Sequence, residues 1–282
     1  MTERGTLFLV ATPIGHLGDI SERARDILGR VDVVAAEDTR RTRQLLSHLG
    51  LRKKLISVHG HNEVGRIAAL QAVLSQGQDI ALVSDGGTPL ISDPGEKVVA
   101  ALAEDGFDVV SVPGPCAAIV ALTVSGLPAD RFTFVGFPPR TPKKADEAIE
   151  ALVATPGTLI FYESPRRTTV LLDRLLAKLG DRRAVLCREL TKLHEEVVRG
   201  TLSSLRLRTE QGLLGEIVVL VEGAAAVRAT QAVDVPRVEA QLKDGERPRD
   251  IARELARRSG LSSRAAYAKV LAVKARMEGG ST

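Results

Sequence analysis

Aromatic residues and cysteine are scarce in this sequence. Its 282 residues include no tryptophan, two tyrosines, six phenylalanines and two cysteines. So few rings argue against the extended stacking platform of proteins that bind single-stranded nucleic acid. Cys116 and Cys187 have no metal-ligand spacing around them. A reduced chain without a disulfide framework is therefore expected.

Long apolar runs and nucleotide-binding signatures are also missing. The apolar stretch 7–11 is too short for the core of a signal peptide, and no run approaches the length of a membrane span, so a cytoplasmic protein without a membrane partner is expected. The chain has no G-x-G-x-x-G and no Gly-Lys-Ser/Thr, so neither NAD nor ATP is favoured. His59 and His61 form H-x-H without a completing ligand, and no metal is expected.

Size and charge suggest two domains and a basic appendage. A hydrophobic content of 44% and a charged content of 26% are ordinary for a globular protein, and 282 residues exceed one typical domain. The net charge is +4. Residues 232–282 carry 11 Lys and Arg against 7 Asp and Glu, so this tail accounts for the whole excess.

The stretch 80–95, IALVSDGGTPLISDPG, is the most informative part of the chain. Residues 80–84 form an apolar run typical of a strand buried on both faces, and the sequence Asp85-Gly86-Gly87 is typical of a turn. Asp93 is expected to cap the next helix, with Pro94 at its first position. A loop at the carboxyl end of a parallel strand is where open α/β sheets bind ligands. The alternative is a tight strand-to-helix connection without a ligand.

The same alternation of strand and helix recurs along the chain. Apolar runs bounded by turn residues predict the strands, and Ser, Thr, Asp or Asn residues predict the helix starts. The helix that starts after Ser164 is expected to bury Val170, Leu172, Leu175, Leu176 and Leu179. The expected strands are 6–11, 31–36, 55–58, 80–84, 108–112, 132–137, 157–162, 184–187 and 215–222, and the expected caps are Ser21, Asp38 or Thr39, Asn62 and Ser164.

Three charged segments admit two interpretations each. In 37–41, arginines at the start of a helix oppose its dipole, which favours a nearby anion over a merely solvated helix start. In 188–196, a functional group of ionisable residues competes with a solvated charge run. In 138–144, PPRTPKK, phosphate contact and a solvated linker are equally compatible with the residues.

The basic tail suggests a helix-turn-helix that meets phosphates. A helix opening at Pro248, a turn at 259–263 and a second helix over 265–273 would project its cations outward, although a capping helical pair with a solvated face is the alternative. The candidate residues for binding nucleic acid are Arg249, Arg253, Arg257, Arg258, Arg264 and Lys269.

Seven runs together carry a specific resemblance. They are residues 10–20 (VATPIGHLGDI), 36–40 (AEDTR), 84–95 (SDGGTPLISDPG), 113–117 (PGPCA), 161–166 (FYESPR), 188–192 (RELTK) and 215–219 (GEIVV). With these runs the chain resembles the small-subunit ribosomal RNA cytidine 2′-O-methyltransferase family, a branch of the tetrapyrrole-methylase-like superfamily. His16 and Cys116 stand where the family is expected to have Asn and often Ser.

The resemblance implies a fold and a cofactor. It implies two α/β domains, at 1–127 and 128–225, with a helical module at 226–282, a homodimer, and S-adenosylmethionine held in the cleft between the domains. The partner would be ribosomal RNA or the small ribosomal subunit. The implied cofactor-binding residues are Pro13, Asp85, Gly86, Gly87, Thr88, Pro89, Ile91, Pro113, Ala117 and Tyr162.

The implied reaction is displacement at the sulfonium methyl group by a ribose 2′-oxygen. Positioning and a proton acceptor should supply the rate. Our hypotheses are Asp38 as base or orienter, Arg40 as a clamp for phosphate or ribose, and Lys192 as a cation that lowers the hydroxyl pKa. Two rivals remain: a tetrapyrrole or diphthine methyltransferase, and an RNA-binding protein without enzymatic activity.

Overall fold

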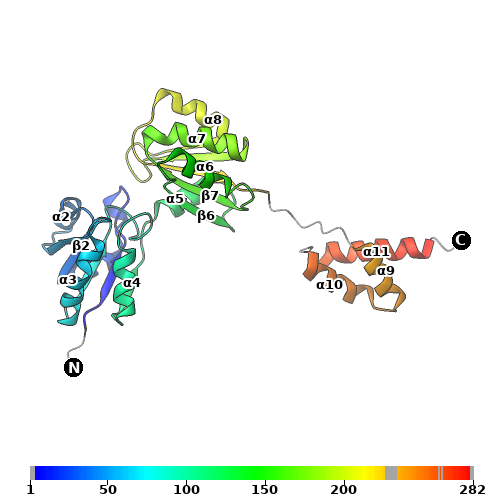
Figure 1. Ribbon diagram of the computed structural model, residues 1–282, viewed down its shortest axis with the longest axis horizontal. Coiled ribbons are helices and arrows are strands. Elements are labelled where there is room, and N and C mark those ends of the chain that lie inside the picture. The colour runs from blue at the N-terminus through cyan, green and yellow to red at the C-terminus, as the bar shows by residue number, and fades with distance from the viewer. Residues whose placement is uncertain (1–3, 226–233, 260, 262, 280–282) are drawn as a thin grey trace. The chain divides into compact units, whose positions relative to one another are not determined.

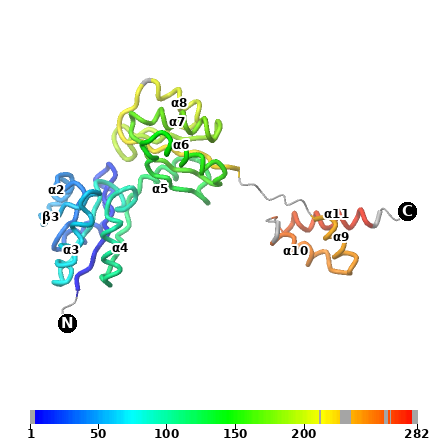
Figure 2. Tube along the Cα trace, in the orientation of Figure 1, coloured from blue at the N-terminus to red at the C-terminus, as the bar shows by residue number. Residues whose placement is uncertain are grey.

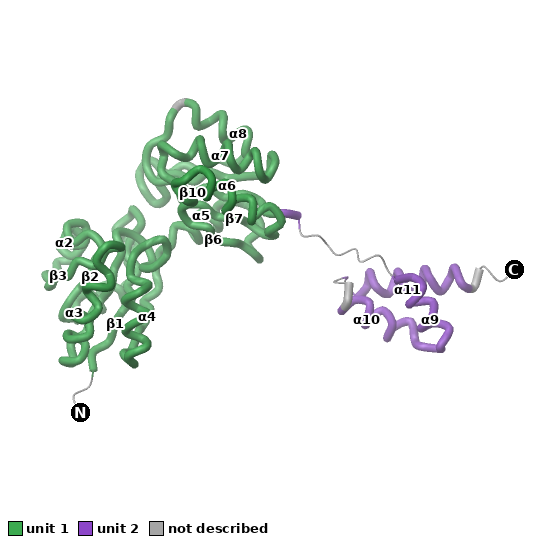
Figure 3. Tube along the Cα trace, in the orientation of Figure 1, with its two compact units in different colours: residues 1–223 green, residues 224–282 purple. Residues whose placement is uncertain are grey.

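The computed structural model describes residues 4–225, 234–259, 261 and 263–279. The chain divides into two compact units, Met1–Gly223 and Ala224–Thr282 (Figure 3). Within the described residues, the first unit holds two five-stranded sheets, and the second unit is helical (Figure 1). This arrangement confirms the expected fold class, two α/β sheets followed by a helical module.

The first sheet is parallel throughout, with strand order β3-β2-β4-β1-β5. Helices cover both of its faces. In β2, Val34 and Ala36 pack with α1 and α2, whereas Val33 and Ala35 pack with α3 and α4. Burial on both faces explains why these strands have continuous apolar sequences. The elements are β1 (Leu7–Val10), η1 (Leu17–Asp19), α1 (Glu22–Arg30), β2 (Val33–Ala36), α2 (Thr39–His48), β3 (Lys54–Ser57), α3 (Glu63–Ser75), β4 (Ile80–Val83), α4 (Glu96–Glu104) and β5 (Val109–Val112).

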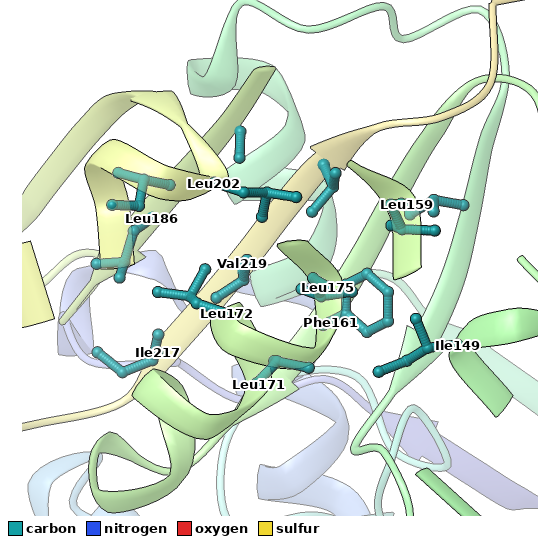
Figure 4. Close-up of a cluster of buried hydrophobic side chains, with 14 residues drawn as sticks. Ile149, Leu159, Phe161, Leu171, Leu172, Leu175, Leu186, Leu202, Ile217 and Val219 are labelled. Atoms are coloured by element: carbon teal, nitrogen blue, oxygen red, sulfur yellow. The ribbon is translucent and has the colours of Figure 1, made fainter. Parts of the chain in front are cut away.

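The second sheet is mixed, with strand order β6-β7-β10-β8-β9. Only the β6–β7 pair is parallel among the described strands of this sheet. Leu172, Phe161 and Val219 belong to the core under α7 and α8 (Figure 4). The elements are α5 (Ala117–Ser125), β6 (Phe132–Gly136), α6 (Pro142–Glu150), β7 (Thr158–Glu163), α7 (Pro165–Leu179), β8 (Arg183–Arg188), β9 (Glu196–Thr201), α8 (Leu202–Arg208), η2 (Thr209–Gln211) and β10 (Ile217–Glu222).

Helix α5 links the two sheets. It follows β5 of the first sheet, yet its buried residues Ala118, Ala121 and Leu122 pack against β7, β8 and β10 of the second. The expected domain boundary after residue 127 falls between the end of α5 at Ser125 and the start of β6 at Phe132. The precise domain limits stay a prediction.

Some expected helix starts are confirmed and others are wrong. Ser21 and Asp38 cap α1 and α2 through their side chains. Asp93 does not cap α4, because Gly95 takes that position with φ +125° and gives its N–H to the Glu63 carboxylate. Asn62 precedes α3, but its side chain accepts the His59 N–H instead of a helix N–H.

The inward face of α7 also differs from its expected one. Val170 is exposed, and Leu171 occupies the buried position beside Leu172. The expectation was wrong because a run of adjacent apolar residues leaves the phase of the helix ambiguous by one position. Sequence reasoning also missed β9, which has one charged residue at its start and another in its middle and lies at the edge of the sheet.

The second unit contains one helix more than expected. Besides α10 (Pro248–Ser259) and α11 (Ser263–Gly279), its described part includes α9 (Val235–Lys243), capped by Asp234. Val238 of α9 joins Ile251, Ala266 and Val270 in one apolar core. The expectation of two helices about a turn was therefore incomplete. Across the described chain, none of the helices combines the length and apolarity needed to cross a bilayer.

Candidate functional site

A pocket of about 740 Å³ lies within the first unit. One wall consists of the loops that follow β1, β4 and β5, at the carboxyl ends of the parallel strands, and of the first turns of α2, and the other belongs to the second sheet. Figure 2 traces the backbone of this unit, with α2, α3 and α4 in one part and α6, α7 and α8 in the other. The residues of the first wall that line the pocket include Thr12, Pro13, Ile14, Arg41, Asp85, Gly86, Gly87, Thr88, Ile91, Asp93 and Cys116. From the second come Phe137, Tyr162, Glu163, Ser164, Lys192, Gly215, Glu216, Ile217 and Val218.

Backbone hydrogen bonds tie the loops of the first wall together. Thr12 and Gly87 exchange two N–H···O=C bonds, each 2.9 Å long. The Thr88 hydroxyl donates to the Pro115 carbonyl at 2.9 Å, so the loops after β1, β4 and β5 form one connected surface. Leu90 and Ser92 have φ values of +75° and +67°, a backbone region that non-glycine residues rarely adopt. The chain therefore holds this wall in a fixed shape at some conformational cost.

Gly87 marks the closest approach in this wall. Its φ is +96°, and a Cβ there would lie 3.3 Å from Ile14 Cγ2 and 3.6 Å from the Pro115 oxygen. A side chain at this buried, pocket-lining position would therefore press against the loops after β1 and β5. Glycine lets these loops pack closely beside the pocket.

The same wall gathers carboxylates. Asp85 accepts the Asp38 N–H at 3.0 Å and lies 3.5 Å from Arg41 Nη1. Burial, with a further contribution from the negative charge of Glu37, raises the pKa of Asp93 to about 6. Burial and the charge of Asp85 also raise the pKa of Glu37. A positive ligand would relieve this accumulation of negative charge.

The second wall supplies aromatic rings. Tyr162 on β7 packs edge-on against Phe134, with ring centroids 5.0 Å apart, and against Phe137 at 5.6 Å. The Tyr162 hydroxyl accepts the Ala118 N–H at 2.9 Å, which fixes the ring to the start of α5. Burial is the main cause of the raised pKa of this hydroxyl, so it stays neutral.

Lys192 reaches the pocket from the loop after β8. Its Nζ lies 2.8 Å from Glu189 Oε1 and 3.2 Å from Glu216 Oε2. Partial burial by itself lowers the pKa of the ammonium, but the two carboxylates outweigh it and raise the pKa, so Lys192 stays charged. Glu189 and Thr191 both have positive φ. This strained loop lies close to Gly15, where a Cβ would be 2.5 Å from the Lys192 side chain.

Most of the residues predicted to bind the cofactor line the pocket. The structure brings together Pro13, Asp85, Gly86, Gly87, Thr88, Ile91, Ala117 and Tyr162. Pro89 and Pro113 are outside the lining. Of the two positions that depart from the family pattern, Cys116 lines the pocket, whereas His16 uses Nδ1 to accept the Gly18 N–H.

The three predicted catalytic residues do not come together. Lys192 lines the pocket, but Asp38 and Arg40 do not. Arg40 is 84% exposed and forms a bidentate pair with Asp38, with distances of 3.1 and 2.9 Å. Hydrogen bonds from Arg40 lower the pKa of Asp38 to about 2. The roles assigned to these residues stay predictions.

Sequence reasoning missed several lining residues. Asp93 had been interpreted as a helix cap, and Phe137 as an ordinary strand residue. Glu216 and Glu163 had received no role. Phe137, Glu163 and Glu216 could have been found only by their position, since each lies at or next to the end of a strand that borders the pocket, whereas Asp93 lies in the long loop between β4 and α4. Which strand ends meet depends on the topology of the sheets.

The predicted RNA-binding residues lie on the second unit. Arg249, Arg253, Arg257, Arg264 and Lys269 are all exposed. Arg253 lies 3.6 Å from Asp250. The side chain of Arg258 lies outside the described residues. Within the described residues there is no cluster of His, Cys, Asp and Glu suited to a metal ion.

Comparison with known sequences identifies the family. The profile of the Tetrapyrrole (Corrin/Porphyrin) Methylases matches residues 6–206. The chain is 45% identical to "Ribosomal RNA small subunit methyltransferase I" of Xylella fastidiosa (strain Temecula1), over 95% of this chain and 99% of that one. It is 46% identical to the protein of the same name from Escherichia coli O157:H7, over 85% of each chain.

Solved structures show the same fold at lower identity. A cobalamin biosynthetic enzyme, cobalt precorrin-4 methyltransferase, superposes with a TM-score of 0.58 at 18% identity and covers 77% of this chain and 94% of its own. Uroporphyrin-III C-methyltransferase from Thermus thermophilus, in complex with S-adenosylhomocysteine, superposes with a TM-score of 0.57 at 20% sequence identity. The match covers 77% of this chain and 97% of that one. With the near full-length sequence matches, these findings lead to one conclusion: the chain is a methyltransferase that belongs to the ribosomal RNA small subunit methyltransferase I family, within the tetrapyrrole methylases.

Proposed function

We propose that this chain transfers the methyl group of S-adenosylmethionine to the 2′-oxygen of a cytidine ribose in the RNA of the small ribosomal subunit. The observation that carries the proposal is the 45–46% identity, over 85–95% of this chain, to proteins named as methyltransferases of that RNA. The cytidine and the 2′-oxygen come from the sequence resemblance. A ribosomal substrate would place the reaction in the cytoplasm.

The first wall of the pocket fits the cofactor. S-adenosylmethionine carries one net positive charge and an electrophilic methyl group on its sulfonium. Gly86, Gly87 and Thr88 line the pocket, and its volume of about 740 Å³ is within the usual range for a small-molecule site. Burial first and neighbouring carboxylates second raise the pKa values of Glu37 and Asp93, and a cation would offset the neighbouring negative charge.

The second wall fits an acceptor that must lose a proton. Lys192 keeps its positive charge, held by Glu189 and Glu216. A cation beside a hydroxyl favours the deprotonated oxygen, so Lys192 would activate the ribose. Asp38 suits the orienting role better than that of a base, because its carboxylate holds the exposed Arg40 at the start of α2, where a phosphate would meet the guanidinium.

The second unit would bind RNA beyond the pocket. Its five described candidate cations are exposed on α10 and α11. Exposed lysines and arginines contribute affinity for phosphate that depends on salt more than on sequence. We also propose that the chain acts as a homodimer, as the family resemblance implies.

The experiment that tests the reaction uses small ribosomal subunits from cells that lack this protein. The purified chain and labelled S-adenosylmethionine should restore one methyl group per subunit, and mapping of positions protected from alkaline cleavage should place it on a cytidine 2′-oxygen. Label on a base atom would overturn the ribose assignment. No label on RNA would overturn the proposed substrate.

The tetrapyrrole methylase alternative rests on the fold, since the matching profile and the solved neighbours carry those names. Incubation with uroporphyrinogen in place of the subunits separates the two: methylated porphyrin without methylated RNA would favour the alternative. The RNA-binding alternative predicts no binding of S-adenosylmethionine in calorimetry.

A further inference from the structure

Phe137 is an exposed aromatic ring in a chain that has few of them. The sequence contains eight phenylalanine and tyrosine residues, and only Phe132 and Phe137 are both large and prominently exposed among the described aromatic residues, at 41% and 58%. An exposed ring alone is ordinary. Phe137 differs from Phe132 because it lines the pocket.

The backbone before Phe137 sets the direction of this ring. β6 has an irregular register with β7 between Phe134 and Gly136, and Gly136 takes a φ of +69°. A Cβ on Gly136 would lie 3.0 Å from the Ser92 hydroxyl, so the end of β6 closely approaches the loop of the opposite wall. Bulges of this kind redirect the next side chain.

Tyr162 packs against the Phe137 ring in an edge-to-face arrangement. Their centroids are 5.6 Å apart with an interplanar angle of 66°. Because Tyr162 is itself fixed by the Ala118 N–H and by Phe134, the Phe137 ring rests on a rigid base. An edge contact of this kind leaves ring surface free, in agreement with the 58% exposure, and such a surface suits a planar ligand.

Four cations without ion-pair partners lie on the segments that flank this ring in the fold. Arg140 lies in the loop after Phe137, Lys143 and Lys144 lie in the first turn of α6, and Arg166 lies in the first turn of α7 next to the pocket residue Pro165. The start of α7 lies against the loop that precedes α6, since Arg167 of α7 donates to the Pro139 carbonyl at 3.4 Å. All four cations are exposed, and the described residues offer none of them an ion pair.

The charges are also unfavourable for the helices themselves. Neither α6 nor α7 has an acidic residue in its first turn, although the positive end of a helix dipole favours one. Cations collected at two such ends are stabilised when an anion lies between them. Repeated phosphates beside an unpaired base supply both the negative charge and the planar ring.

We infer that Phe137 stacks on the nucleobase of the nucleotide to be methylated, and that Arg140, Lys143, Lys144 and Arg166 hold the phosphates that flank it. The partner is thus a single-stranded or locally opened RNA segment, because a base within a duplex has no free face. One ring serves one base, which agrees with the scarcity of aromatic residues elsewhere. The inference rests on the proposed function and specifies how that RNA is held.

The first test substitutes Phe137 in the full-length chain. With small subunits lacking the methyl group as substrate, Phe137→Ala should raise KM about 5- to 100-fold, the range for loss of one stacked base. Phe137→Trp should restore most of the affinity, whereas Phe137→Leu should not, because it keeps the apolar contact but offers no flat ring. The dissociation constant for S-adenosylmethionine, measured by calorimetry, should change less than twofold.

Phe132→Ala is the matched control, since it removes an exposed ring from the same strand outside the pocket lining. It should leave KM unchanged. If Phe137→Ala weakens the cofactor as much as the RNA, the ring serves the adenine and the inference is overturned. An unchanged KM overturns it as well. If the unsubstituted chain fails to methylate subunits, the proposed function fails instead.

The second test replaces Arg140, Lys143, Lys144 and Arg166 by glutamine. Removal of one cation that meets a phosphate should reduce the slope of log(1/KM) against log salt by about 0.7, so the four together should reduce it by roughly 3. The control replaces Arg52 and Lys54, which are exposed at the amino end of β3, away from the carboxyl ends that border the pocket. An equal slope in both variants overturns the phosphate assignment.

Discussion

The two walls of the pocket achieve their shape by opposite means. The wall from the parallel sheet is built of backbone: small residues, two positive-φ turns at Leu90 and Ser92, and the Thr12–Gly87 pair. The wall from the mixed sheet presents side chains, with Tyr162 and Lys192 held by defined partners. Backbone suits a ligand of constant shape, and side chains suit a reaction partner that needs activation.

This difference assigns the cofactor to the first wall and the acceptor to the second. A change in the first wall should therefore alter binding of S-adenosylmethionine, and a change in the second should alter turnover or RNA affinity. A substitution in one wall that changes the property assigned to the other wall would contradict this assignment.

The largest effect is expected at Gly87. Gly87→Val should reduce affinity for S-adenosylmethionine more than 100-fold, because the side chain meets Ile14 and Pro115 and forces a residue with a Cβ into φ +96°. Calorimetry gives the dissociation constant. Gly106→Val is the control, since it has φ +73° but nothing within 4 Å. If both variants bind equally well, the first wall does not hold the cofactor.

Lys192→Met should lower kcat by about 100-fold. The methionine keeps most of the volume but removes the charge that would favour deprotonation of the ribose. Affinity for S-adenosylmethionine should change little, and Lys192→Arg should recover part of the rate. If the variant loses affinity for S-adenosylmethionine but keeps its kcat, Lys192 serves the cofactor and not the acceptor.

A smaller effect, about tenfold, is expected from the pH dependence of cofactor binding. Asp93 has a pKa of about 6, so its negative charge appears as the pH rises through 6. Affinity for the cationic S-adenosylmethionine should rise over the same interval, and Asp93→Asn should flatten this rise. S-adenosylhomocysteine, which lacks the sulfonium charge, should show a weaker dependence. Equal pH profiles for the two ligands would contradict the assignment.

The same carboxyl should affect stability with a definite sign. Because its pKa is raised from 3.8, the folded chain holds this proton more tightly than the unfolded chain. The contribution of Asp93 to the free energy of unfolding is therefore most favourable below pH 4 and is lost as the pH rises to 6. At pH 7, Asp93→Asn should raise the thermal midpoint, measured by circular dichroism.

The smallest effect on turnover is expected from removal of residues 224–282. The whole unit should be removed, since deleting α10 and α11 alone would expose the part of the core that α9 contributes. At low salt, kcat should stay within threefold. The slope of log RNA affinity against log salt should fall, because the deletion removes the exposed candidate RNA-binding cations of α10 and α11 together with other exposed cations of this unit. An unchanged slope would confine RNA binding to the first unit.

Local patterns were sufficient for much of the fold. Apolar runs predicted the strands of the parallel sheet, since strands buried on both faces have no room for polar residues. Ser21 and Asp38 were predictable caps because their side chains bond within three residues. The edge strand β9 and the face of α7 were not predictable, because each depends on what packs beside it.

The candidate site also combines features that the local sequence predicts with features that depend on packing. The sequence by itself determined the glycine-rich turn at 85–87, because positive φ and close approach are local properties of glycine. Tertiary structure alone decided that the charge of Glu37 acts on Asp93, that Glu216 pairs with Lys192, and that Phe137 lines the pocket. These pairs join residues far apart in the chain, and the order of strands in the two sheets, which no local pattern encodes, brings them together.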